Sequence, residues 1–215
     1  MGRVGRGGAA AGGLGIVGVI ILLLFQFLGG NAGGSLPNLN ELDGTQVGGG
    51  APPSDIAQEC RTGADADKKE ICRLVGFTNS IQAYWKGEFA RQNERYQQAA
   101  TVFFSGQVNT ACGAATSAVG PLYCPPDQKV YLDTDFFKEL QSRFGAQGGP
   151  FAEAYVIAHE YGHHVQNLSG ILDRVARDRS TGPNSAAVRS ELQADCLAGV
   201  WAHHAQSTGY LTNVT

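Results

Sequence analysis

Two histidines and a glutamate stand at a spacing that can bind and use a metal ion. In the segment His159-Glu160-Tyr161-Gly162-His163, the histidines are four residues apart. On an α-helix they would lie about 40° apart on one face, where both imidazoles can reach the same Zn²⁺. Glu160 would then be placed to act as general base toward a metal-bound water. The pattern predicts a metal-dependent hydrolase and favours a peptidase.

The residues around this motif have the pattern of a buried helix. Pro150 suits a first helical turn, and Gly170 suits a C-terminal stop. Buried polar side chains need partners, and a metal ion would supply them. The alternative is a surface helix that carries His and Glu by chance. The apolar residues on both sides of the motif argue against that alternative; they are Phe151, Ala154, Tyr155, Ile157, Ala158, Val165 and Leu168.

A second predicted helix, from Ser190 to about Gln206, carries candidates for the rest of the site. Glu191 and Asp195 are four residues apart and share a face of this helix. Catalytic zinc usually keeps three protein ligands, so we expect Glu191 to be the third ligand, from an antiparallel neighbouring helix. We expect Asp195 to accept a hydrogen bond from the free N–H of a ligating imidazole. The alternative is a solvated acidic face, which is commoner for such a pair but fits poorly within an apolar helix.

The other histidines have no clear role in the sequence. His164 points about 100° away from His163, so it is expected to be a polar supporting residue and not a ligand. His203 and His204 lie late in the second helix. They either line the active-site cleft and stabilise an oxyanion, or form a partly exposed pair, which is the commoner situation.

Both helical motifs resemble those of the putative neutral zinc metallopeptidase family of bacteria. The resemblance rests on residues 158–166 (Ala-His-Glu-Tyr-Gly-His-His-Val-Gln), on residues 191–196 (Glu-Leu-Gln-Ala-Asp-Cys) and on the glycine-rich N-terminus, and it extends over most of the chain. It implies zinc ligands at His159, His163 and Glu191, with Glu160 as the base. Members of the family continue beyond the second helix, so we expect this sequence to be truncated at its C-terminus.

The N-terminal residues favour a membrane anchor. An uncharged apolar segment can span a bilayer at residues 14–30, and Arg3 and Arg6 precede it. We therefore expect a cytoplasmic N-terminus (1–13), a transmembrane anchor (14–30), a flexible Gly/Pro-rich tether (31–55) and an exported domain (56–215). A cleaved signal peptide is the alternative, and it also exports the domain. The formal net charge of −3 gives no basic excess that would suggest a nucleic-acid partner.

Five cysteines are consistent with export to an oxidising compartment. The sequence contains no Cys-x-x-Cys motif, so a structural zinc cluster is not expected. Proximity favours disulfides between Cys60 and Cys72 and between Cys112 and Cys124, each worth about 2–3 kcal/mol. Cys196 is left over and is expected to be a buried, inert thiol, with a nucleophilic or ligating thiolate as the alternative.

The remaining pattern predicts an α+β domain of zincin-like layout, mostly helical with a small sheet and two metal-bearing helices. We expect helical structure from Asp67 to Gln98 and a short helix over 136–144. Strands are expected at 101–105, 122–124 and 129–132. In zinc peptidases an extended substrate commonly adds to a sheet edge beside the metal helix, and these strands can provide that edge.

The sequence therefore predicts a membrane-anchored, exported endopeptidase with one Zn²⁺ per chain and a peptide or protein as substrate. The metal would lower the pKa of its water toward about 7, and Glu160 would take the proton during attack on the scissile carbonyl. Two other classes stay open. One is a catalytically inactive metal-binding or scaffolding protein of the cell envelope. The other is a tethered interaction module with incidental histidines.

Overall fold

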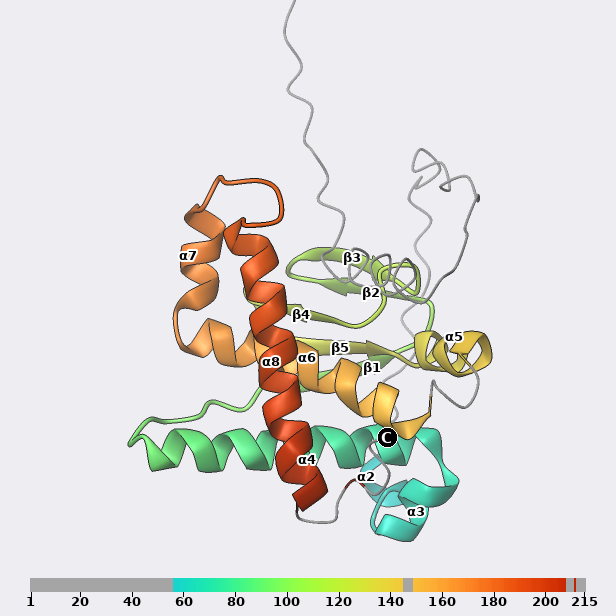
Figure 1. The fold of residues 1–215 in the computed structure, drawn as a ribbon. Coiled ribbons are helices and arrows are strands. Elements are labelled where there is room, and N and C mark those ends of the chain that lie inside the picture. The colour runs from blue at the N-terminus through green and yellow to red at the C-terminus, as the bar shows by residue number, and fades with distance from the viewer. Residues whose placement is uncertain (1–55, 145–148, 208–210, 212–215) are drawn as a thin grey trace, which may run out of the picture.

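The computed structural model describes residues 56–144, 149–207 and 211 (Figure 1). The expected cytoplasmic segment (1–13), anchor (14–30) and tether (31–55) lie outside these residues. No helix within the described ranges combines the length and apolarity needed to cross a membrane.

The described residues form a mostly helical α+β domain with two small sheets. Three long helices, α4, α6 and α8, pack with a three-stranded sheet (Figure 1). The elements follow in the order α2 (Ile56–Glu59), α3 (Gly63–Lys68), α4 (Glu70–Arg91), β1 (Ala100–Phe104), β2 (Gln107–Thr110), β3 (Gly113–Thr116), β4 (Leu122–Cys124), β5 (Lys129–Asp133), α5 (Thr134–Phe144), α6 (Pro150–Leu168), α7 (Ile171–Arg177) and α8 (Ala186–Ser207).

The larger sheet has the strand order β1-β5-β4. Strand β1 runs parallel to β5, and β4 runs antiparallel to it, so β4 lies at an edge. These three strands agree with the expected ones to within one residue at each end. The hairpin of β2 and β3 was not expected, because its short segments are rich in polar, Gly and Ala residues and have no apolar alternation. A disulfide between Cys112 and Cys124 joins the hairpin loop to the end of β4.

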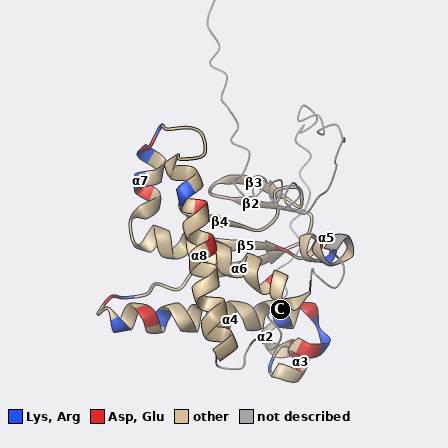
Figure 2. Ribbon diagram, in the orientation of Figure 1, with Lys and Arg blue, Asp and Glu red and all other residues tan. Residues whose placement is uncertain are grey.

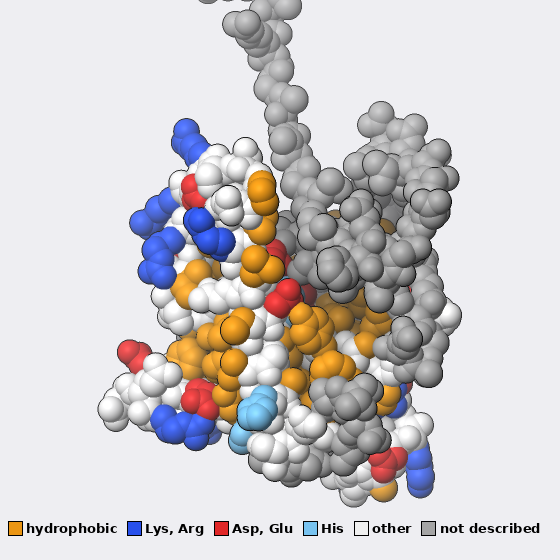
Figure 3. Space-filling view, in the orientation of Figure 1, with side chains coloured by type: hydrophobic (Ala, Val, Ile, Leu, Met, Phe, Trp, Pro, Cys, Tyr) orange, Lys and Arg blue, Asp and Glu red, His pale blue; other side chains and the backbone are white. Residues whose placement is uncertain are grey.

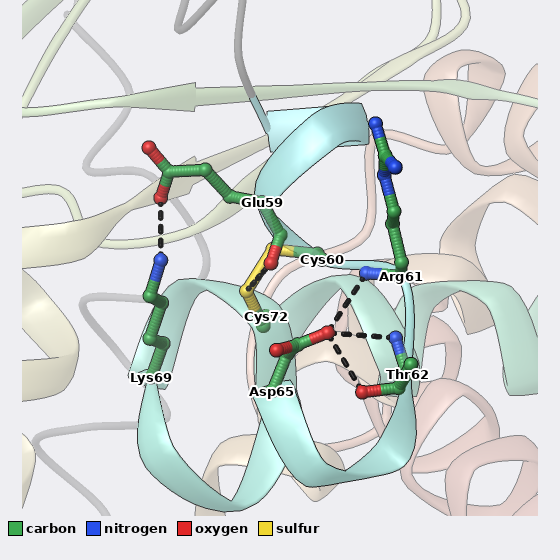
Figure 4. Close-up of a disulfide and its surroundings, with 7 residues drawn as sticks. All are labelled: Glu59, Cys60, Arg61, Thr62, Asp65, Lys69 and Cys72. Carbon is green, nitrogen blue, oxygen red and sulfur yellow. Dashed lines mark hydrogen bonds and ion pairs between the residues drawn. A yellow bond between two sulfur atoms is a disulfide. The ribbon is translucent and has the colours of Figure 1, made fainter.

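The helix expected from Asp67 to Gln98 is interrupted and shorter. Lys69 has an extended backbone and separates α3 from α4. Beside this break, the Cys60–Cys72 disulfide ties α4 to the end of α2, and Asp65 accepts hydrogen bonds from the backbone N–H groups of Arg61 and Thr62 (Figure 4). Helix α4 ends at Arg91, shortly before Asn93 adopts a left-handed conformation, which asparagine tolerates better than most residues.

One hydrophobic core joins the three long helices to the sheet. Its largest fully buried apolar side chains are Trp201, Tyr161, Phe137, Leu74, Ile81, Leu132 and Ile157. A partly buried ion pair fixes the start of α6 against α4: Arg73 Nε and Nη2 donate to the two carboxylate oxygens of Glu153, at 2.7 and 3.0 Å. The hydroxyl of Tyr161 lies 2.6 Å from that of Thr101, which joins α6 to β1.

Helix α8 crosses obliquely over α6 (Figure 1) and does not run antiparallel beside it as expected. At the crossing, Gly162 of α6 faces Ala194 of α8 so closely that a Cβ atom on the glycine would lie 3.0 Å from the Ala194 Cα and carbonyl oxygen. The helix backbones therefore meet one turn after Glu191, and this contact sets which face of α8 looks inward.

The way α8 packs leaves Cys196 exposed, so the expectation that Cys196 is a buried thiol is wrong. Among the large apolar residues of α8, Trp201 faces the core, but Val188, Leu192 and Val200 are exposed. Apart from Trp201, the buried apolar residues of α8 are small; they are Ala194, Ala198, Ala202 and Ala205. Hydrophobic side chains are accordingly visible along α8 in the space-filling view (Figure 3).

Candidate metal centre

Three potential ligand atoms converge where α6 crosses α8. His159 Nε2 and His163 Nε2 are 3.1 Å apart, and Glu191 Oε2 lies 3.3 Å from the first and 3.4 Å from the second. The histidines come from successive turns of α6, as their spacing predicted, and the glutamate comes from the first turns of α8. Within the described part of the chain, this is the one group of three His, Cys, Asp or Glu residues close enough to hold a metal ion.

The dimensions and surroundings of this triangle fit Zn²⁺. Tetrahedral zinc with bonds of 2.0–2.1 Å holds neighbouring ligand atoms about 3.3 Å apart, close to the observed separations. Both carboxylate oxygens of Glu191 are buried and have no hydrogen-bond partner among the described residues. A buried carboxylate without such partners is costly unless a cation meets it. Two nitrogens and one carboxylate oxygen are also a donor set that zinc accepts.

The imidazole of His159 is held by Asp195. The distance from Nδ1 to the Asp195 Oδ1 is 2.8 Å, and the Tyr155 hydroxyl donates to the same oxygen at 2.6 Å. Because a carboxylate only accepts hydrogen bonds, Nδ1 of His159 carries the hydrogen and Nε2 faces the centre of the triangle. Burial opposes the charged form of this imidazole, but contacts with Asp195 and Glu191 outweigh it and raise the pKa of His159 to about 10.

The imidazole of His163 is held by Gln166, a residue that the sequence analysis did not identify. The amide nitrogen of Gln166 donates to the Ser190 carbonyl at 2.7 Å and to the Gln193 side chain at 3.0 Å. Its Oε1 is thereby turned toward His163 Nδ1, 2.9 Å away. Nδ1 must donate to this oxygen, so Nε2 of His163 also faces the triangle. A signal was available, because Gln166 lies three residues after His163, on the same side of the helix.

Glu160 is buried beside the two histidines and has one free oxygen. A hydrogen bond from the backbone of Tyr123 reaches its carboxylate, whereas Oε2 has no partner among the described residues. Burial raises the pKa of Glu160, and the neighbouring histidines only partly offset this effect. A carboxylate with a raised pKa and an unpaired oxygen is suited to accept and return a proton.

The remaining histidines lie away from the triangle. His164 is fully buried, and its Nε2 donates to the Gln97 carbonyl at 2.6 Å while its Nδ1 lies 3.0 Å from the Tyr123 hydroxyl. Burial lowers its pKa. His203 and His204 are exposed at the far end of α8, where they line a separate cavity with Tyr84 and Cys196. The suggestion that either lines the active-site cleft is therefore wrong for the described residues.

An open cleft of about 440 Å³ adjoins the triangle on the side of His163 and Glu191. Glu160 lies in its wall, and so do Leu122 and Tyr123 of the edge strand β4. The other walls come from the β2–β3 hairpin and from α7, a short helix that the sequence analysis did not predict. A candidate base, a candidate metal position and a sheet edge thus share one solvent-accessible cleft.

The sequence matches the model of one protein family, described as "Putative neutral zinc metallopeptidase", over residues 1–214. Among curated proteins, it is 53% identical to the uncharacterized protein Rv2575 of Mycobacterium tuberculosis over 157 residues, which cover 73% of this chain and 52% of that protein. It is 45% identical to the uncharacterized protein YpfJ of Escherichia coli over 131 residues, 59% of this chain and 45% of that protein. The chain therefore matches about half the length of these relatives. No solved structure matches it significantly.

Proposed function

The chain belongs to the putative neutral zinc metallopeptidase family, and from this premise we propose that it is a zinc-dependent endopeptidase. His159, His163 and Glu191 would hold one Zn²⁺, with Asp195 and Gln166 fixing the two imidazoles. The observation that carries this proposal is the triangle itself: two imidazole nitrogens and a buried, otherwise unpaired carboxylate oxygen at the separations of a tetrahedral zinc shell.

The proposed chemistry is peptide-bond hydrolysis with Glu160 as proton carrier. Bound zinc would supply an activated water and polarise the scissile carbonyl. Glu160 would take a proton on its unpaired Oε2, hold it in a buried position where its pKa is raised, and deliver it to the leaving amine. The β4 edge would align an extended substrate, because Leu122 and Tyr123 of this strand line the same cleft as Glu160.

We further propose that the enzyme acts outside the cytoplasm and is anchored by residues 14–30. The Cys60–Cys72 and Cys112–Cys124 disulfides support an oxidising compartment for the domain. The anchor itself rests on the length of the apolar N-terminal segment and on the arginines before it. A single-pass topology of this kind would put the domain on the periplasmic or extracellular side.

Two variants test the enzymatic proposal in the full chain. Glu160→Gln should keep one zinc per chain but lose at least ~10²-fold in peptide turnover, because an amide cannot take the proton. His159→Ala should lose both zinc and turnover. Elemental analysis and peptide digestion measure the two properties separately. Zinc binding without turnover in the wild-type protein would favour the inactive metal-binding alternative, and unchanged zinc in His159→Ala would rule out this site.

A further inference from the structure

The cleft beside the metal centre has a composition that selects among substrates. Apart from Glu160, His163 and Glu191, no described residue in its lining is charged. Both glutamates are already assigned to the proposed metal and proton transfer, so the lining offers no spare charge to a substrate side chain. An acidic side chain of a substrate would also be repelled by the carboxylates of Glu160 and Glu191.

The polar side chains of the lining are already paired. The Thr110 hydroxyl donates to the Gly113 carbonyl at 2.8 Å, and the Ser190 hydroxyl donates to the Ala187 carbonyl at 2.7 Å. The Tyr123 hydroxyl accepts a hydrogen bond from Asn167 and lies 3.0 Å from His164 Nδ1. The polar groups that remain for a substrate are therefore those of the backbone, which suit its main chain better than its side chains.

Apolar groups form the rest of the wall. Leu172 and Val175 lie one turn apart on α7 and face the cleft together with Ala176. The charged residues of α7 are Asp173, Arg174 and Arg177, and all three are exposed. Their positions on the helix are coloured in Figure 2. The hairpin contributes Gly113, Ala114 and Ala115 to the lining. These residues are small, so they do not narrow the cleft. The Cys112–Cys124 disulfide fixes this hairpin wall to β4.

We propose that this cleft binds an uncharged apolar side chain, of the size of leucine or phenylalanine, from a substrate residue next to the scissile bond. The proposal rests on the peptidase function proposed above and names its substrate class: extended peptides with a large apolar residue at that position. Burial of such a side chain favours it over a charged or very small one by about 10- to 100-fold in affinity.

Binding tests the proposal without relying on turnover. The full-chain Glu160→Gln variant, loaded with zinc and immobilised, is mixed with a random peptide library, and the retained peptides are sequenced. Peptides with a large aliphatic or aromatic residue at one position should be enriched at least about 10-fold over peptides with Glu or Lys there. No retained peptides, or retention without this preference, would overturn the assignment.

Changes on α7 locate the preference in this wall. Val175→Glu, made in the same background, should lose the apolar preference and gain peptides with Lys or Arg at that position. Ala176→Phe should narrow the cleft and shift the preference toward smaller apolar residues. The matched control is Arg174→Gln, which makes the same change of −1 in charge on the exposed face of α7 and should leave the preference unchanged. An unchanged preference in both Val175→Glu and Ala176→Phe would overturn the assignment.

Wild-type digestion of the same library separates this proposal from the one on which it rests. Apolar-selective binding by the Glu160→Gln variant, without cleavage by the wild-type protein, would contradict the peptidase function and retain the cleft assignment. Cleavage without any preference for an apolar residue near the cut would support the peptidase function and contradict the cleft assignment.

Discussion

The two histidines of the site depend on different partners. His159 is oriented by the Asp195 carboxylate, whereas His163 is oriented by the neutral amide of Gln166. The same amide also binds the Ser190 carbonyl, one residue before Glu191. Gln166 therefore connects the orientation of one proposed ligand to the position of the turn that carries another, and its effect should appear in metal affinity.

We predict that Gln166→Met weakens zinc binding by about 10- to 100-fold, since it keeps the shape of the side chain but removes both hydrogen-bonding groups. Gln166→Glu should recover part of this affinity, because a carboxylate can accept from His163 Nδ1. The same variant should lower the melting temperature, because its second oxygen faces the Ser190 carbonyl. Competition with a chelator measures the zinc affinity. The control is Gln193→Ala, which removes only the exposed side chain to which the Gln166 amide donates. Unchanged affinity in Gln166→Met would contradict this role.

Glu191 and Asp195 are expected to differ in the size of their effects. Glu191→Ala removes the carboxylate at the triangle and should abolish most zinc binding. Asp195→Ala leaves all three atoms in place but frees the His159 ring, so it should cost only about 10- to 100-fold in affinity. Zinc titration of both purified variants checks the order, and a larger loss in Asp195→Ala would reverse the two roles.

At the scale of elements, the close crossing of α6 and α8 determines the distance between Glu191 and the histidines. We predict that Gly162→Val separates the helices, because its side chain would overlap the Ala194 backbone, which cannot move away independently of its helix. Zinc affinity and melting temperature should both fall. Gly87→Ala in α4 is the control: apart from the local backbone of α4, no atom of the described residues lies within 4 Å of its added Cβ, so it should stabilise the domain by up to about 1 kcal/mol. Wild-type zinc affinity in Gly162→Val would contradict this account.

The elements also indicate how far the sequence could lead. The helical period put His159 and His163 on one face, and Glu191 and Asp195 on one face of a second helix. The usual three ligands of zinc and the family resemblance then joined the two pairs. The local apolar patterns located β1, β4 and β5. The face of α8 could not be deduced, because apolar residues lie all around it and the contact with Gly162 decides which of them are buried. Cys196 was placed wrongly for this reason. The hairpin and α7 were missed because short elements owe their structure mainly to packing against the rest of the domain.

At the scale of the whole molecule, two disulfides close loops at separate places. Cys60–Cys72 ties α2 to the start of α4, and Cys112–Cys124 ties the hairpin to β4. We predict that peptide mapping of the native protein under non-reducing conditions recovers both pairs and a free Cys196 thiol that reacts with a soluble alkylating reagent before denaturation. Free thiols at the four paired positions would contradict both the pairing and the proposed oxidising location.

The closely spaced nitrogens and carboxylate of the triangle have a consequence for how the domain matures. A folded chain that holds these groups together is stabilised by any cation that binds there and not to the unfolded chain, by about 2.7 kcal/mol when free zinc is 100 times its dissociation constant. The melting temperature of the purified protein should therefore rise with free zinc and fall with a chelator, and Glu191→Ala should make it insensitive to both. Zinc supply would then decide how much of the protein survives proteolysis after it has folded.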